Sequence, residues 1–366
     1  MIMPDYNDSI TNLACSIKRY FELEYGHNTI KDIDDVLDNR KPRNVVVILC
    51  DGMGFNIMKR ALDKNSFLIS HIIRDISSVV PSTTTAATTS MLSALNPCEH
   101  GWLGWDLYVK PEDKIVSLFK NKLKDSQKIA ASYNIARKYF GYRNICEQIN
   151  DNGKYKAKIL FPFGNEKYFD LNDMLDRIYY ECKKDGKKYI YAYYEEPDGS
   201  MHEYGVDSDI AVSRINYIND RVEEMCSKLD SDTIVIVTAD HGHINCTDVV
   251  LSEYPDIKNL LDGDVSVEGR MCSIKVKAGK KEDFSKLFEK YFGDDFILKT
   301  KDEVLNDKMF GNGEEHLLFR DSLGDYFALA IGNKYIRYSE RSDKYKAMHA
   351  GFTEDEMRIP LIVFAK

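Results

Sequence analysis

The sequence lacks the features of a disulfide-stabilised, thiolate-metal or membrane-spanning protein. Its eight cysteines are dispersed, and no two of them form a Cys-x-x-Cys pair. The first 20 residues carry two aspartates, a lysine and an arginine, which fits neither a signal peptide nor a membrane span. No later segment reaches the ~20 apolar residues that spanning requires. We therefore expect a soluble, cytoplasmic protein with reduced and mostly buried thiols.

Excess positive charge, repeats and low-complexity tracts are also missing. Lysine and arginine number 50 against 59 acidic residues, so the net charge is 50 − 59 = −9. This balance argues against a broad nucleic-acid-binding surface and leaves room for a locally positive pocket that binds a small substrate. It says nothing about the oligomeric state.

The 366 residues, 43% of them hydrophobic, are enough for one large α/β domain and a smaller appended one. Residues 1–43 are predicted to be helical. Continuous apolar runs at 44–50, 189–194, 233–238 and 360–365 are typical of parallel strands covered on both faces. Helical patterns at 171–184 and 210–229 lie between them, so we predict a doubly wound, mostly parallel sheet with helices on both faces.

Two stretches interrupt this alternation. Residues 107–162 are rich in tyrosine and lysine, and we interpret them as a variable insertion. Residues 265–332 predict strands at 271–276, 296–300 and 325–331 and a helix at 280–291, which together suggest a small α+β cap. The core would then comprise residues 1–264 and 333–366, with the cap inserted before the last core strand.

Candidate metal ligands follow or precede the predicted core strands. In an open parallel sheet, ligands bind beyond the carboxyl ends of the strands. Each position taken alone has an ordinary structural explanation, such as a helix N-cap or a satisfied histidine. Their arrival at one sheet edge favours a site for two divalent ions. The candidates are Asp51, Asp198, His202, the adjacent pair Asp240 and His241, and His349. Nothing in the spacing requires His243, and we leave it outside the ligand set.

A hydroxyl-rich segment, residues 81–90, supplies a candidate nucleophile. It follows a short predicted strand at 77–80 and precedes a helical stretch at 91–95. A hydroxyl at a helix N-terminus is exposed to the helix dipole and to free backbone N–H groups, and a bound metal ion lowers its pKa. The alternative is an N-cap in a helix of small residues. With the metal cluster nearby, Thr84 is the candidate nucleophile.

These residues resemble the pattern of the alkaline phosphatase superfamily, and within it the nucleotide pyrophosphatase/phosphodiesterase-like (type I phosphodiesterase) branch. The resemblance covers residues 45–105, 188–246 and 345–366 and includes the segment 96–101, Asn-Pro-Cys-Glu-His-Gly. It implies an alkaline-phosphatase-like fold and two zinc sites. One would be held by Asp51, Thr84, Asp240 and His241, and the other by Asp198, His202 and His349.

The sequence departs from the family pattern at two places. The family usually follows the nucleophile with Phe-Pro-Asn-His, whereas residues 85–88 read Thr-Ala-Ala-Thr. The family also carries an asparagine that contacts the phosphoryl group, where residues 102–105 read Trp-Leu-Gly-Trp. Trp105, Trp102 or Tyr108 would stack on a substrate base or pack under the cap, and Trp105 and Tyr108 are the candidate substrate-binding residues.

The resulting hypothesis is a two-metal hydrolase of phosphate esters, a phosphodiesterase or nucleotide pyrophosphatase that forms a phospho-threonine intermediate at Thr84. The two divalent ions would be Zn²⁺, with Mn²⁺ as the alternative, and the partner a small phosphate ester or nucleotide. A phosphomonoesterase or a phosphonate (phosphonoacetate-like) hydrolase could use the same metals. A non-catalytic metal-binding scaffold is the alternative from another class. A sulfatase is disfavoured because no Cys/Ser-x-Pro-x-Arg segment occurs.

Overall fold

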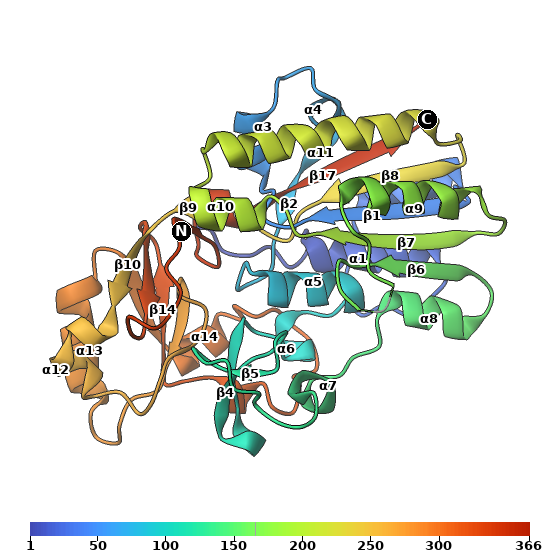
Figure 1. Cartoon of the computed structure of the whole chain (residues 1–366). Helices are drawn as coiled ribbons and strands as arrows, with labels where there is room; N and C mark the ends of the chain where they lie inside the picture. The colour runs from blue at the N-terminus through green and yellow to red at the C-terminus, as the bar shows by residue number, and fades with distance from the viewer. Residues whose placement is uncertain (165) are drawn as a thin grey trace.

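The computed structural model describes residues 1–164 and 166–366. Its larger sheet, by number of residues, has six strands in the order β2-β17-β8-β1-β7-β6, and Figure 1 shows it between two layers of helices. In chain order these strands are β1 (Asn44–Cys50), β2 (Ile72–Ser77), β6 (Lys156–Leu160), β7 (Lys188–Tyr194), β8 (Thr233–Thr238) and β17 (Arg358–Ala365). Every residue of β1 and β8 is buried, as their continuous apolar runs predict.

Strand direction follows the prediction in the middle of the sheet and departs from it at β17. Strand β1 runs parallel to β7 and β8, and β6 runs parallel to β7. Strand β17 is antiparallel to both β8 and β2, so the prediction of a parallel strand at 360–365 is wrong. A strand in the interior of a covered sheet is apolar in either direction, so its composition does not reveal its direction. The sheet as a whole is mostly parallel and doubly wound, as predicted.

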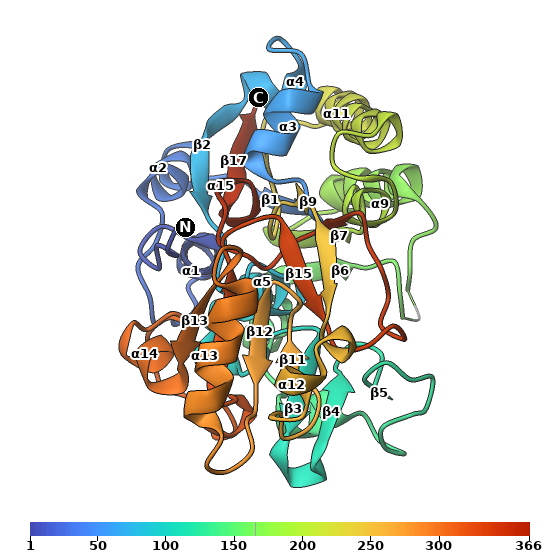
Figure 2. The ribbon, with the colours of Figure 1, turned by 90° about the vertical axis from the view of Figure 1, so that its left-hand side faces the viewer.

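Helices cover both faces of this sheet, and Figure 2 shows α9 and α11 on one side with α1 and α2 on the other. The first layer contains α3 (Phe55–Ala61), α4 (Phe67–Ser70), α9 (Leu171–Lys183) and α11 (Asp209–Lys228). The second contains α1 (Ile10–Tyr20), α2 (Lys31–Arg40), α5 (Thr84–Ser93) and α8 (Ile145–Asn152). Small side chains allow α5 to pack closely against α1, and all but one of its residues are buried.

A second sheet lies beside the first and has seven strands in the order β13-β14-β12-β11-β3-β4-β5. Four of its strands come from the predicted cap: β11 (Ser266–Val267), β12 (Met271–Ile274), β13 (Phe296–Thr300) and β14 (Tyr326–Ala330). The other three come from the segment interpreted as an insertion: β3 (Asp106–Val109), β4 (Lys114–Ser117) and β5 (Lys122–Leu123). The single residue pair that joins them is Val267 with Asp106. Residues 107–162 are thus divided, since β6 belongs to the larger sheet.

The remaining elements are short, apart from α13, and connect or cover the two sheets. The helices are α6 (Pro97–His100), α7 (Ile135–Tyr139), α10 (Asp198–Tyr204), α12 (Pro255–Lys258), α13 (Lys281–Phe292), α14 (Lys301–Asn306) and α15 (Glu354–Met357). The strands are β9 (Ile244–Asn245), β10 (Thr247–Val250), β15 (Lys334–Arg337) and β16 (Ala347–Met348). Within the described ranges, the search for a helix with the length and hydropathy of a membrane span finds none. The predicted strand at 77–80 is instead β2, which ends at Ser77.

Candidate metal centre

The predicted ligands and nucleophile meet at one edge of the larger sheet. Asp51 directly follows β1, and Asp240 comes two residues after β8 ends. Asp198 begins α10 just beyond β7, and Thr84 begins α5 beyond β2. The carboxyl ends of these four strands share one edge because β2, β8, β1 and β7 all run in the same direction. His349 precedes β17, and the antiparallel direction of that strand places its start at this same edge.

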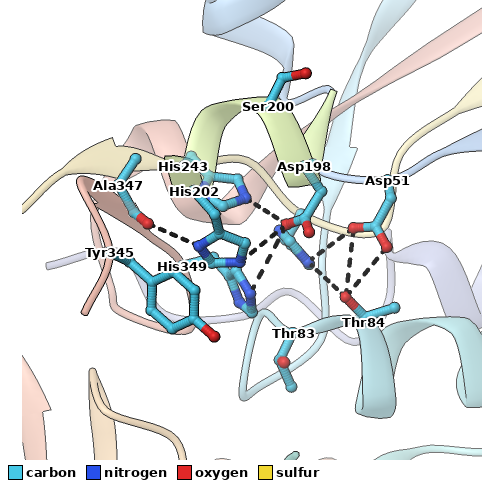
Figure 3. A network of polar contacts seen from close by, with 12 residues as sticks. Asp51, Thr83, Thr84, Asp198, Ser200, His202, His243, Tyr345, Ala347 and His349 are labelled. Carbon is cyan, nitrogen blue, oxygen red and sulfur yellow. Dashed lines mark hydrogen bonds and ion pairs between the residues drawn. The ribbon is translucent and has the colours of Figure 1, made fainter. Parts of the chain in front are cut away.

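Four of the residues form the first group, around the hydroxyl of Thr84. Its Oγ1 lies 3.3 Å from both carboxylate oxygens of Asp51 and 3.2 Å from Nε2 of His241. The same Nε2 lies 3.3 Å from Asp51 Oδ1 and 3.6 Å from Asp240 Oδ2. The side chains of Asp240 and His241 are fully buried. Figure 3 shows the Thr84 hydroxyl pointing toward the Asp51 carboxylate.

The second group is built around the carboxylate of Asp198. Its Oδ1 lies 3.4 Å from Nε2 of His202 and 4.0 Å from Nε2 of His349. The His241 and His349 rings stack with their centroids 3.9 Å apart, so the two groups are adjacent. All seven residues that the sequence proposes as ligands or nucleophile are therefore brought together.

These separations fit metal coordination. Two ligand atoms bound to one tetrahedral zinc ion at 2.0–2.1 Å lie about 3.3 Å apart. The distances within the first group, 3.2–3.6 Å, are close to that value and long for direct hydrogen bonds. Asp240 Oδ2 is also buried and has no hydrogen-bond partner among the described residues. A buried carboxylate oxygen without a partner is costly, and a divalent cation would satisfy it.

Three histidines are held so that Nε2 faces the centre. The Nδ1 atoms of His202, His241 and His349 lie 2.8, 3.1 and 3.2 Å from the backbone carbonyl oxygens of Ala347, Gly242 and Ser82. A carbonyl only accepts, so each Nδ1 carries the proton and each Nε2 keeps its lone pair. This is the arrangement in which histidine binds a metal and a backbone group fixes its ring.

The electrostatics of the site favour a cation. Burial, with the neighbouring charges of Asp240 and Asp198, holds the pKa of Asp51 well above its ordinary value. Burial also raises the pKa of Asp240 to about 7. Burial opposes the ionisation of Asp198, but the adjacent His202 and His243 outweigh it and hold that pKa well below its usual range. A bound dication would stabilise the ionised forms of the neighbouring Asp51 and Asp240 carboxylates, which otherwise resist ionisation.

Three of the site histidines are held neutral at physiological pH by burial, as ligation requires. Burial lowers the pKa of His241 to about 4 and that of His243 to about 4. Burial, with repulsion from the His241 and His243 rings, holds the pKa of His349 well below 6.5. A neutral imidazole can offer its lone pair to a metal without first losing a proton.

Sequence reasoning missed two residues that contact these carboxylates. Tyr193, in β7, donates a short hydrogen bond from its hydroxyl to Asp51 Oδ2. His243 is fully buried with its Nε2 2.6 Å from Asp198 Oδ1. Tyr193 lies within an apolar run and gives no sequence signal. The signal for His243 was its position two residues after His241, in the same loop.

A cavity of about 550 Å³ opens over the site, and its lining includes Thr84, Asp198 and His349. Trp105 also lines it, half-buried, with the Lys120 ammonium 5.2 Å from the ring centroid. Trp102 packs instead, because its indole Nε1 donates to the carbonyl of Phe140.

Tyr108 does not line the cavity within the described part of the chain. Its hydroxyl donates to Asp113 Oδ1 at 2.8 Å, and the Lys275 ammonium lies 4.2 Å from its ring centroid. The structure therefore brings Trp105 to the site and places Tyr108 elsewhere.

Comparison with known families now identifies the chain. The sequence model of the type I phosphodiesterase/nucleotide pyrophosphatase family matches residues 45–351. The chain belongs to this family. Membership indicates hydrolysis of phosphoesters, and it confirms the resemblance found in the sequence. The comparison with curated protein sequences finds no match.

Solved structures of this fold are similar at low sequence identity. Murine ectonucleotide pyrophosphatase/phosphodiesterase 5, an inactive threonine-to-alanine variant in complex with AMP, has a TM-score of 0.65 and 18% identity, covering 87% of each chain. The human protein of that name has a TM-score of 0.67 and 17% identity, with the same coverage. Phosphonoacetate hydrolase from Sinorhizobium meliloti, in complex with phosphonoformate, has a TM-score of 0.64 and 15% identity, covering 88% of this chain and 90% of the other.

Proposed function

We propose that this protein is a two-metal phosphodiesterase or nucleotide pyrophosphatase in which Thr84 is the nucleophile. The observation that carries the proposal is the position of the Thr84 hydroxyl, which lies 3.2–3.3 Å from Asp51 and His241 in a residue that lines the cavity. A buried threonine oxygen among metal-binding side chains has the placement that attack on phosphorus requires.

The residues divide into two cation sites. Asp51, Thr84, Asp240 and His241 would hold one ion, and Asp198, His202 and His349 the other. Two divalent ions, Zn²⁺ or Mn²⁺, would lower the pKa of the Thr84 hydroxyl and neutralise charge on the phosphoryl oxygens. Thr84 is also the first residue of α5. The first backbone N–H groups of a helix have no partner inside it and favour an anion such as a phosphoryl group.

The reaction would take place in two displacements. The Thr84 hydroxyl would lose its proton to solvent and its oxygen would attack phosphorus in line, so a bond from Oγ1 to phosphorus forms while the bond to the leaving oxygen breaks. The leaving group departs as phosphate, or as an alcohol after taking a proton from solvent. Water then attacks the phospho-threonine on the opposite side and restores the hydroxyl. The Asp51 carboxylate, 3.3 Å from the Thr84 hydroxyl, would share one cation with it.

The cavity supports a nucleotide-sized substrate. Its volume of about 550 Å³ lies within the ~300–1,000 Å³ range of small-molecule sites. Trp105 on its wall offers an aromatic surface to a base, and the Lys120 ammonium lies close to that ring. The murine neighbour described above holds AMP and is inactive with a threonine replaced by alanine. Both descriptions agree with a nucleotide substrate and a threonine nucleophile here.

The test compares wild type with Thr84→Ala and Thr84→Ser on bis(p-nitrophenyl) phosphate and a nucleoside diphosphate ester, in protein whose metal content has been measured. We expect Thr84→Ala to lose turnover by at least about 10³-fold while retaining bound metal. Thr84→Ser should keep part of the activity because it retains a hydroxyl. Full activity of Thr84→Ala would refute the nucleophile assignment. Bound metal with no turnover of any ester by wild type would indicate a non-catalytic scaffold.

A second candidate, phosphonate hydrolysis, is favoured by the basic side chains of Lys120, Lys122 and Arg341 on the cavity wall. A phosphonocarboxylate carries a second anionic group that such side chains would bind. Turnover of phosphonoacetate above that of the aryl diester would favour this candidate. Faster turnover of p-nitrophenyl phosphate would indicate a phosphomonoesterase.

A further inference from the structure

His243 occupies a distinct position among the four histidines of the site. It is fully buried, and its ring centroid lies 4.7 Å from that of His202, 5.0 Å from that of His349 and 5.4 Å from that of His241. Its Nε2 approaches Oδ1 of Asp198. A ring nitrogen of His243 therefore lies in the same cluster as potential ligand atoms of Asp198, His241 and His349, and Figure 3 shows the ring beside Asp198.

The hydrogen bonding of His243 differs from that of the other three rings. Those rings donate Nδ1–H to backbone carbonyls and leave Nε2 free. The Nδ1 of His243 is buried and makes no hydrogen bond with the described residues, whereas its Nε2 faces a carboxylate. If Nε2 bound a metal, Nδ1 would carry the proton and leave a buried donor without a partner, which is rare. A proton on Nε2 avoids this, because it is donated to Asp198.

The distance supports the same assignment. His243 Nε2 and Asp198 Oδ1 are 2.6 Å apart, whereas Asp198 Oδ1 and His202 Nε2 are 3.4 Å apart. Two ligands of one zinc ion should be separated by about 3.3 Å, and a charge-assisted hydrogen bond by about 2.7–2.9 Å. His202 fits the first description and His243 the second.

The ring is also held by its surroundings. Gly52 lies in the loop after β1, and its neighbours leave no space for a side chain at this position. A Cβ on Gly52 would lie 3.0 Å from Cδ2 of His243 and 3.1 Å from Cα of Asp198. The backbone of this loop therefore packs against both residues of the pair.

We propose that His243 is a positioning residue that donates Nε2–H to Asp198 and fixes the carboxylate for the second cation site, without itself binding the ion. The proposal rests on the two-cation site of the proposed function and adds a residue to it. Hydrogen bonds to ligating carboxylates orient them, and loss of such a partner lowers metal affinity by about 10–100-fold.

The experiment measures Zn²⁺ stoichiometry and affinity by competition with a chromophoric chelator for wild type, His243→Met and His243→Gln. Methionine removes the donor at similar volume, whereas the glutamine amide places an N–H near the position of Nε2. His243→Met should weaken one of two sites by about 10–100-fold, and His243→Gln should restore most of that affinity. His100→Gln, which alters another buried histidine outside the site, should leave both affinities unchanged.

Each outcome separates this proposal from the two-cation site. Equal affinities in wild type and both variants would overturn the positioning role and leave the two-cation site intact. Loss of an entire ion in His243→Gln as well as His243→Met would overturn it in favour of direct ligation, because an amide is a poor zinc ligand. Absence of tight Zn²⁺ binding by wild type would instead refute the two-cation site. The unfolding temperature of the metal-free variants tests that they remain folded.

Discussion

Replacing Arg270 with methionine should destabilise the protein strongly, because it breaks a fully buried ion pair. Arg270 Nε lies 2.6 Å from Glu356 Oε1, and Nη2 lies 2.9 Å from Oε2, with neither side chain exposed. Arg270 also donates to the carbonyls of Lys334 and Gly332. Glu356 accepts from the backbone N–H of Gly351, two residues after His349.

The magnitude follows from the charge left behind. Removal of one partner leaves the other buried without compensation, which costs about 3–5 kcal/mol. The carbonyls that lose a donor add to this cost. We therefore expect Arg270→Met to lower the free energy of unfolding of the metal-free protein, measured by urea denaturation, by about 3–5 kcal/mol. In a double-mutant cycle with Glu356→Gln, the two losses should be less than additive by about 2–3 kcal/mol, because the charges interact directly.

A surface pair provides the control. Lys286 and Glu282 are 2.7 Å apart on α13, with side-chain exposures of 71% and 80%. Glu282→Gln should leave the denaturation midpoint unchanged, since exposed pairs are screened by water. A decrease of less than about 1 kcal/mol in the free energy of unfolding of Arg270→Met would refute the reasoning that this buried ion pair stabilises the fold. Strict additivity in the double-mutant cycle would refute the direct interaction between Arg270 and Glu356.

Three variants of the site give four further predictions. Tyr193→Phe removes the hydroxyl that donates to Asp51, so it should lower Zn²⁺ affinity by about 10–100-fold with unchanged circular dichroism. Asp240→Asn should raise the free energy of unfolding of the metal-free protein at pH 8. Burial raises the pKa of Asp240 to about 7, so keeping its carboxylate ionised in the folded state lowers that free energy progressively as the pH rises from about 4 to about 7. The gain in the variant should therefore vanish below about pH 4. The same variant should lose the stabilisation that Zn²⁺ gives wild type, which thermal unfolding with and without the ion measures. Trp105→Ala should raise KM for a nucleotide substrate by about fivefold or more and leave KM for bis(p-nitrophenyl) phosphate nearly unchanged, if the ring stacks on the base.

Much of the larger sheet could be predicted from the sequence because its strands are continuous apolar runs. The runs at 44–50 and 233–238 correspond to β1 and β8 without change of bounds. The direction of β17 could not be predicted, since an apolar run of this kind occurs in strands of either direction. The joining of β3 to the cap sheet was also hidden, because it depends on one residue pair between Val267 and Asp106.

The convergence of the candidate ligands could be predicted because most of them directly follow core strands, whereas their supporting contacts could not. Tyr193 lies within the apolar run of β7, and nothing in that run indicates a polar role, yet its hydroxyl donates to Asp51. His243 offers a suitable residue type, but spacing alone does not show whether its ring reaches a ligand, faces solvent or packs in the core. Hydrogen bonds of this kind depend on how the loops after different strands pack, and a linear pattern does not contain that information.

The direction of β17 explains why His349, which precedes its strand, lies beside residues that follow theirs. Asp51, Asp198 and Asp240 leave the sheet at its carboxyl edge because β1, β7 and β8 are parallel. A parallel final strand would have placed His349 at the opposite edge, about the length of a strand away. Strand β17 is eight residues long, which at ~3.3 Å per residue corresponds to roughly 26 Å. The proposed second cation site therefore depends on the reversal of this one strand, and with it on the packing of the loop between His349 and Glu356.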